Sequence, residues 1–513
     1  RTSASQAEYA GSIPVIGSSF TSAGHTPDSR PSPWGRGPRN GPARWPLAAR
    51  ACKRIVRARP TTKCDDGRVS DGRVRYARNG DVRLAYRVFG DSGPLLIWTP
   101  GWVVSNVDTI GEPDSPYVRL IDLVSQSMQF VMFDRRGTGL SDPTTHLLSL
   151  DERIDDLRAV VDAIGVDRPV LVGSSEGGCV STLFAARYPE RVSFLCLYGS
   201  AARFSQDLPD FPWGFTPAEV DAQLDEIDRD WGEGALGDLF YGEAADVPGV
   251  RHMFGRLQRS IASPTMAKLG WRAFMEIDVS SVLAAVRAPT LVLARPGDQL
   301  VPIEAAAAMA AAIPNAHFHA LAPGPHNGFD VLDDLFEHVM AFVSDNPSAP
   351  PDERILKTAM FTDIVGSTEK LTARGDAHWR HQLDIHDKLV DHTLSRFSGF
   401  RANHTGDGVF ALFDAPTKAA KCALQLVPAL AARGIPIRAG IHTGECERRG
   451  TEWSGMAVHT GARISAMAGP GEVLASRTVR DLSAGSGLRF ESLGVQQLKG
   501  LPEEVEVFRI SAH

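Results

Sequence analysis

Five short apolar runs alternate with longer segments of helical pattern, and this alternation constrains the fold more than any other feature. The runs are LLIW at 95–98, FVMF at 130–133, PVLVG at 169–173, FLCLYG at 194–199 and TLVLA at 290–294. Strands separated by helices run parallel in one sheet that is covered on both faces. We therefore predict an α/β domain with a mostly parallel sheet over residues 72–343. Between residues 200 and 286 the alternation stops, and acidic helical sequence bearing Trp and Phe predicts a cap over a site.

The chain has 513 residues, which is too long for one ordinary domain. The proline-rich stretch DNPSAPPDER predicts a linker over 344–354 and a second, α+β domain over 355–511. Residues 1–70 are rich in Arg, Pro and Ser and predict a disordered basic tail. Its bias could mimic a transit peptide, but we favour a solvated tail, or upstream sequence translated from a misassigned start.

Charge and cysteine usage narrow the partners and the compartment. The net charge is −7, although residues 1–70 hold 12 Lys and Arg against 4 Asp and Glu. The rest of the chain is therefore strongly acidic, and we expect no nucleic-acid partner for it. No apolar run reaches the ~18 residues of a membrane helix, so we expect no membrane partner. Six scattered cysteines without a CxxC pair indicate reduced thiols and a cytoplasmic location.

A first catalytic motif, Gly-Ser-Ser-Glu-Gly at 173–177, follows an apolar strand and opens a helical stretch of small residues. Glycines on both sides allow a tight turn that presents Ser175 as a nucleophile. Asp298 and His326 follow two later strands, in the order acid then histidine. His326 would take the serine proton, and Asp298 would hold the imidazole tautomer and stabilise its cation. Each residue alone is an ordinary loop residue, but the three in order at strand ends predict a triad.

An oxyanion hole is predicted from the backbone N–H groups of Trp102 and Glu176. With these motifs and FDRRGTGLSD at 133–142, residues 72–343 resemble the α/β-hydrolase family. Many members carry His-Gly in the oxyanion loop, whereas this chain has Pro100-Gly101. The resemblance implies an esterase for a small ester, or a sensor that binds such a ligand without turning it over.

A second motif, FTDIVGST at 361–368, reads as a strand that ends at Asp363, followed by a phosphate-cradling loop. HTGDGVF predicts a hairpin further along the chain, with Asp407 at its tip. Two carboxylates without neighbouring His or Cys suit Mg²⁺ or Mn²⁺ rather than Zn²⁺.

These residues, with IRAGIHTGEC at 437–446, SGMAVHTGARISAMAGPGEVLAS at 454–476 and LKGLPEEVEVFRI at 498–510, resemble the class III nucleotide cyclase catalytic domain. The resemblance implies conversion of ATP, or alternatively GTP, to the 3′,5′-cyclic monophosphate and pyrophosphate in a site shared across a homodimer. It implies two metal ions, Mg²⁺ or Mn²⁺, held by Asp363, Asp407 and the backbone carbonyl of Ile364. It also gives Arg463 the role of stabilising the transition state and Lys499 that of contacting the triphosphate.

Three positions depart from the adenylyl cyclase pattern. Asn403 replaces the usual base-reading Lys, Glu452 replaces its Asp partner, and His459 replaces the ribose-orienting Asn. An amide presents both donor and acceptor, so we expect ATP to be preferred over GTP with loose discrimination.

The combined pattern resembles mycobacterial and actinobacterial fusions of a hydrolase with a cyclase. We interpret the chain as an adenylate cyclase that carries a hydrolase domain as esterase or sensor. The alternative is a serine hydrolase whose cyclase-like part serves dimerisation or regulation.

Overall fold

The computed structural model describes residues 73–102, 106–111, 115, 117–207, 209–246, 248–346, 354–366, 376–404, 408–449, 452–501 and 503–512. The predicted basic tail at 1–70 and most of the predicted linker lie outside these residues.

The first domain is built on one sheet, and each of the five apolar runs forms a strand of it. The strands are β1 (Arg75–Asn79), β2 (Val82–Phe89), β3 (Leu95–Thr99), β4 (Gln129–Phe133), β5 (Val170–Ser174), β6 (Phe194–Tyr198), β7 (Thr290–Ala294) and β8 (Ala316–Ala320). Their order is β1-β2-β4-β3-β5-β6-β7-β8. From β4 to β8 every pairing is parallel, whereas β1 and β2 are antiparallel additions at one edge. The reversal of the chain at Gly80, which has φ +60°, makes that antiparallel hairpin.

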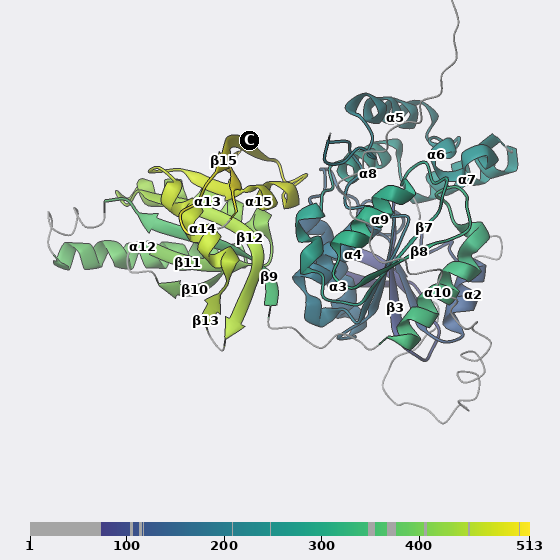
Figure 1. The fold of residues 1–513 in the computed structure, drawn as a ribbon, viewed down its shortest axis with the longest axis horizontal. Coiled ribbons are helices and arrows are strands. Elements are labelled where there is room, and N and C mark those ends of the chain that lie inside the picture. The colour runs from purple at the N-terminus through teal and green to yellow at the C-terminus, as the bar shows by residue number, and fades with distance from the viewer. Residues whose placement is uncertain are drawn as a thin grey trace, which may run out of the picture. The chain divides into compact units, whose positions relative to one another are not determined.

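Helices cover both faces of this sheet, as the alternation predicts (Figure 1). They are α2 (Val118–Ser125), α3 (Leu150–Ile164), α4 (Glu176–Arg187), α9 (Ile303–Ala312) and α10 (Leu332–Asp345), with short 3₁₀ turns η1 (Pro189–Arg191), η3 (Ser280–Ala285) and η4 (Phe329–Val331). Helices α3, α4 and α9 contribute to one buried apolar cluster, and α2 and α10 to another. The middle strands β3, β5, β6 and β7 are buried along their whole length. Two apolar faces explain why these strands read as continuous rather than alternating hydrophobic runs.

The segment between β6 and β7 is the predicted helical cap. It contains α5 (Pro217–Asp230), α6 (Gly237–Tyr241), η2 (Gly242–Asp246), α7 (Pro248–Ile261) and α8 (Pro264–Met275). Helix α5 begins with a capping box, in which Thr216 and Glu219 satisfy each other's backbone N–H groups. Trp271 of α8 is fully buried and packs against Trp102 with ring centroids 4.6 Å apart. That contact ties the cap to the loop after β3.

The second domain is an α+β unit around a mostly antiparallel sheet. Its strands are β9 (Arg354–Ile364), β10 (Phe400–His404), β11 (Gly408–Phe413), β12 (Ile437–Arg449), β13 (Glu452–Ser454), β14 (Val473–Ser476), β15 (Leu488–Gln496) and β16 (Val505–Ala512). Its helices are α12 (Asp376–Arg396), α13 (Pro416–Ala431), α14 (Met456–Met467) and α15 (Arg477–Leu482). The central order is β10-β11-β9-β12-β14-β16-β15, with β13 paired to β12. Strand β12 pairs antiparallel with β9 and parallel with β14.

The cysteines form no disulfides among the described residues. The four described cysteines, Cys179, Cys196, Cys422 and Cys446, are free and buried. Burial raises the pKa of each thiol, which makes it unreactive. Within the described ranges, none of the helices combines the length and the hydrophobicity that crossing a bilayer requires.

Candidate functional site

Ser175 lies on a strained turn between β5 and α4. Its backbone has φ 54° and ψ −129°, a conformation that non-glycine residues rarely adopt. The flanking chain approaches closely, because a Cβ on Gly173 would lie 2.5 Å from Gly178 Cα and one on Gly177 would lie 2.3 Å from the Thr99 carbonyl oxygen. Glycines are therefore required at both positions. Ser175 is buried, and its Oγ has no hydrogen-bond partner among the described residues.

Asp298 and His326 form the expected acid–histidine pair. His326 Nδ1 lies 2.8 Å from Asp298 Oδ2. The other carboxylate oxygen accepts hydrogen bonds of 2.9 Å from the backbone N–H groups of Leu300 and Val301. The two donors on one oxygen fix the plane of the carboxylate. The pair therefore has the geometry in which Nδ1 carries a proton and Nε2 is the free base.

The three predicted triad residues meet at the carboxyl ends of β5, β7 and β8, where open α/β sheets place their sites. A Cβ on Gly199, just after β6, would lie 3.0 Å from His326 Cε1 and 3.5 Å from Asp298 Oδ2. Ser175 and His326 line one cavity of about 70 Å³. The remaining wall is mainly aromatic and comes from both the core domain and the cap: Trp98, Trp102, Tyr117, Phe240, Tyr241, Phe254, Phe329 and Phe336.

The residues predicted to form the oxyanion hole also lie beside the nucleophile. Glu176 is the first residue of α4, so its N–H has no acceptor within the helix. A Cβ on Gly101 would lie 2.7 Å from Ser175 Cβ, so the loop that carries Trp102 packs directly on the nucleophile. Trp102 is held there by a 3.1 Å hydrogen bond from its indole Nε1 to the Ala267 carbonyl of the cap.

Two residues that the sequence analysis missed position the histidine loop. Arg295 is buried after β7 and donates to the carbonyls of Ala322 at 2.9 Å and Asn327 at 3.2 Å. Its guanidinium also forms two 2.7 Å bonds to Asp330. Tyr198 donates a 3.0 Å hydrogen bond to the backbone carbonyl of His326 itself. Arg295 stands three residues before Asp298 in RPGD, but nothing local indicates that it reaches the loop at 322–330.

The side chain of Glu176 is completely buried. Arg135 forms an ion pair with one of its carboxylate oxygens, and Arg153 lies 3.2 Å from the other. The sequence analysis assigned only the backbone of Glu176 and missed both arginines, although Arg135 lies within FDRRGTGLSD.

The second candidate site is described in part. Asp363 lies near the end of β9, and its Oδ2 accepts hydrogen bonds of 2.9 and 2.6 Å from Arg438. Gly408 pairs with Asp363 across β11 and β9, and Ile364 pairs with Ile437. Asp407 itself lies outside the described residues, but it directly precedes Gly408. The register therefore places Gly408, the residue after Asp407 in the sequence, opposite Asp363 on the neighbouring strand.

The other residues of that site are distributed over three elements. Arg463 and His459 lie exposed on α14, and Lys499 lies exposed after β15. Asn403 and Glu452 belong to β10 and β13, and their side chains lie outside the described part. Within the described residues there is no group of three His, Cys, Asp or Glu that could hold a metal ion. Arg438, in IRAGIHTGEC, was not predicted as a partner of Asp363.

A sheet covered on both faces, with a serine on a strained strand-to-helix turn and an acid–histidine pair beyond later strands, defines the class of α/β enzymes with a serine nucleophile. Residues 110–331 match the family model of the alpha/beta hydrolase fold. The chain is 30% identical over 214 residues to 2-hydroxymuconate semialdehyde hydrolase of Pseudomonas sp. (strain CF600), covering 40% of this chain and 71% of that protein. It is 26% identical over 227 residues to strigolactone esterase D14 of Arabidopsis thaliana, covering 44% of this chain and 81% of that protein. The chain belongs to the α/β-hydrolase family.

Part of the chain is similar to a solved structure of adenylate cyclases from Trypanosoma brucei in their monomeric state. The likeness has 22% identity and a TM-score of 0.29, and it covers 32% of this chain and 92% of that one.

Proposed function

We propose that the chain is a serine hydrolase that cleaves carboxylic esters, with Ser175 as nucleophile, His326 as general base and Asp298 as the residue that orients the base. The observation that carries the proposal is the 2.8 Å contact between His326 Nδ1 and an Asp298 carboxylate held by two backbone N–H groups. His326 lines the same cavity as Ser175.

The reaction follows from the roles of these groups. Ser175 Oγ forms a bond to the ester carbonyl carbon while His326 Nε2 takes the hydroxyl proton. The N–H groups of Trp102 and Glu176 stabilise the negative charge that develops on the carbonyl oxygen. The bond to the alcohol oxygen then breaks, and His326 returns the proton to that oxygen. A water molecule, deprotonated by His326, releases the acid from Ser175 in the same way.

The wall of the cavity favours a small, mostly apolar ester. Aromatic rings dominate it, and the Tyr117 and Tyr241 hydroxyls are so deeply buried that the pKa of each is raised above its ordinary value. Neutral phenols can orient a substrate through one hydrogen bond each without adding charge. The two relatives named above are an esterase and a semialdehyde hydrolase, which is the class of chemistry proposed here.

The test is hydrolysis of p-nitrophenyl butyrate by the full chain. We expect Ser175→Ala and His326→Ala to lose at least a thousandfold in kcat, while the surface variant Arg191→Gln keeps wild-type activity. Activity that survives in Ser175→Ala would overturn the assignment of the nucleophile. If the wild type is inactive but binds the ester, the domain acts as a sensor instead.

We further propose a nucleotide cyclase activity for residues 355–511, with ATP preferred over GTP. The register that pairs Gly408 with Asp363 supports it, because Gly408 directly follows Asp407 in the sequence and Ile364 directly follows Asp363. These oxygen donors fit Mg²⁺ or Mn²⁺. When bound, two such ions would supply charge neutralisation at the triphosphate and activation of the ribose hydroxyl.

The chain's own residues would then take distinct roles. Asp363 would exchange its hydrogen bonds with Arg438 for a cation, leaving that guanidinium free to face phosphate oxygens. Arg463 and Lys499, both exposed, would reach the site of a second chain in a homodimer. Asn403 and Glu452 would contact the base, and His459 the ribose.

The test is formation of cyclic nucleotide by the full chain with Mg²⁺ or Mn²⁺. We expect Asp363→Asn to abolish it and the hydrolase variant Ser175→Ala to keep it. Equal loss in both variants, or product from Asp363→Asn, would contradict the proposal. Turnover of GTP comparable to that of ATP would show that Glu452 does not read the base.

A further inference from the structure

A second cavity of about 60 Å³ adjoins the catalytic cavity at Trp102, which lines both. Pro100 and Glu176, the chain neighbours of Gly101 and Ser175, line this second cavity, whereas Ser175 and His326 line the first. One water molecule needs roughly 10–15 Å³ on this measure. The second cavity can therefore hold a small polar group beside the oxyanion loop.

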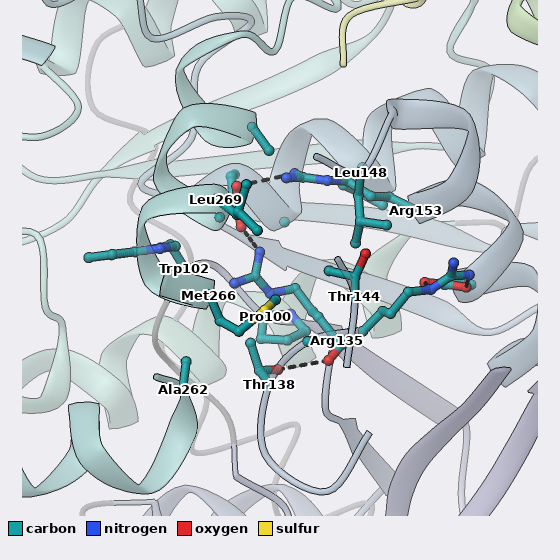
Figure 2. Close-up of a pocket in the computed structure, with 18 of the residues that line it drawn as sticks. Pro100, Trp102, Arg135, Thr138, Thr144, Leu148, Arg153, Ala262, Met266 and Leu269 are labelled. Atoms are coloured by element: carbon teal, nitrogen blue, oxygen red, sulfur yellow. Dashed lines mark hydrogen bonds and ion pairs between the residues drawn. The ribbon is translucent and has the colours of Figure 1, made fainter. Parts of the chain in front are cut away.

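The charged side chains in this cavity do not balance. Among the charged side chains that line the cavity, Arg136 forms two bonds of 3.1 and 2.6 Å to Asp156, and it also lies 4.0 Å from Glu152 outside the lining. Glu176, by contrast, pairs with both Arg135 and Arg153. Figure 2 shows these two arginines among the residues that line the cavity. Two positive charges against one negative charge leave a surplus of one positive charge at the wall.

The nearest further acids offset this surplus weakly. Apart from its ion pair with Glu176, Arg153 is attracted by Asp156, Glu276 and Glu152, but it forms no ion pair with these three acids. Asp156 is already engaged by Arg136, and burial raises the pKa of Glu276. His146 at the edge of the cavity lies 2.8 Å from Glu152. No acid in the described residues pairs with Arg135 apart from Glu176.

The surplus charge is buried in a mainly apolar wall. Met266, Ile261 and Leu148 are among the side chains around Arg135, and they offer it no acceptor. Burial lowers the pKa of Arg135 to about 9, with repulsion from Arg153 contributing, and that of Arg153 to about 10. A buried charge without a full partner is costly, and a ligand anion would remove that cost.

We propose that this cavity binds the carboxylate of a small organic monoanion, with Arg135 as its principal ligand. Only Nη1 of Arg135 is engaged by Glu176, so the guanidinium has further N–H donors for a second carboxylate. A single negative charge matches the surplus, whereas a phosphate dianion would exceed it. The carboxylate belongs either to a free acid, such as the product of ester cleavage, or to an ester substrate of Ser175 that carries an acid group.

Binding is tested by calorimetry with butyrate and its neutral isostere butyramide, on the full chain and on Ser175→Ala. We expect at least tenfold preference for butyrate in both proteins and in the matched control Arg191→Gln, which loses a surface arginine paired with Asp162. Arg135→Gln should abolish the preference. Glu176→Gln, which doubles the surplus, should tighten butyrate binding at least threefold, a gain that misfolding cannot produce. Equal binding of the two ligands, or an unchanged preference in Arg135→Gln, would overturn the proposal.

The source of the carboxylate is tested by hydrolysis, and this arm rests on the proposed esterase function. If the group belongs to the substrate, Arg135→Gln should lower kcat/KM for mono-p-nitrophenyl glutarate at least tenfold more than for p-nitrophenyl butyrate. If it is a free acid, butyrate should change hydrolysis of the neutral ester in the wild type and not in Arg135→Gln. Because calorimetry on Ser175→Ala needs no turnover, failure of the esterase function would leave the binding result intact.

Discussion

Replacement of Arg295 by Met tests whether the histidine loop is held by one buried guanidinium. The Arg295 side chain is 1% exposed and donates to four backbone carbonyls between Ala322 and Asn327. His326 lies within that span. The methionine keeps most of the apolar volume and removes every one of these bonds.

The loss of stability in Arg295→Met depends on how many of the freed acceptors water can hydrate. Asp330 is 61% exposed and would be hydrated after the change. Most of the freed carbonyls lie in a partly exposed loop, so the loss is nearer the net value of ~0.5–1.5 kcal/mol per hydrogen bond than the full desolvation penalty. We expect a loss of about 2–4 kcal/mol in the free energy of unfolding. A displacement of the imidazole by about 1 Å would cost roughly a hundredfold in rate.

The assay combines thermal unfolding with kcat/KM for p-nitrophenyl butyrate, measured well below the melting temperature. Arg295→Lys should be nearly as damaging, because an ammonium cannot reproduce the planar fork. Asp330→Asn, which leaves the bonds from Arg295 to the carbonyls in place, should stay within about threefold of wild type. A folded Arg295→Met variant with wild-type kcat/KM would refute the positioning role.

Three further predictions concern other groups. Asp298→Asn should lower kcat for ester hydrolysis by roughly 10³–10⁴ through the wrong imidazole tautomer, and a loss below tenfold would contradict the triad. Asp363→Ala and Arg463→Ala, each inactive as a cyclase, should recover activity when mixed, and no recovery after demonstrated subunit exchange would exclude a shared site. Burial lowers the pKa of His442 to about 4 in the folded chain. Its unfolded form therefore binds a proton first as the pH falls from about 6.5 to 4, and stability should drop by up to ~3 kcal/mol. The free energy of unfolding, measured with urea, should change less between pH 6.5 and 4 in His442→Gln than in the wild type.

Local motifs in the sequence predict much of the hydrolase site. Ser175 is identified by its flanking glycines and the preceding strand, and Asp298 and His326 follow because each stands directly after a strand of the same sheet. Such signals are short-range, and the parallel topology brings them together. The direction of β1 and β2 is not encoded in hydrophobic periodicity, which is the same for parallel and antiparallel strands at an edge.

The partners of the site residues could not be predicted in the same way. Arg295 binds residues that are 27 to 35 positions away in the sequence. Arg135 lies in the loop after β4, and it contacts Glu176 because the start of α4 packs beside that loop. The pairing of Asp363 with Arg438 depends on the register of β9 against β12. A shift of one residue would turn the side chain to the other face of the sheet. Contacts of this kind become visible only when the strands are paired.

The central claim is that Ser175 is an activated nucleophile, and covalent labelling tests it most directly. The full chain is treated with diisopropyl fluorophosphate, and the modified peptide is identified by mass spectrometry. The account predicts one phosphoryl adduct, on Ser175, which is absent in Ser175→Ala and slowed at least a hundredfold in His326→Ala. Equal labelling of the wild type and Ser175→Ala, or an adduct on another serine alone, would contradict it.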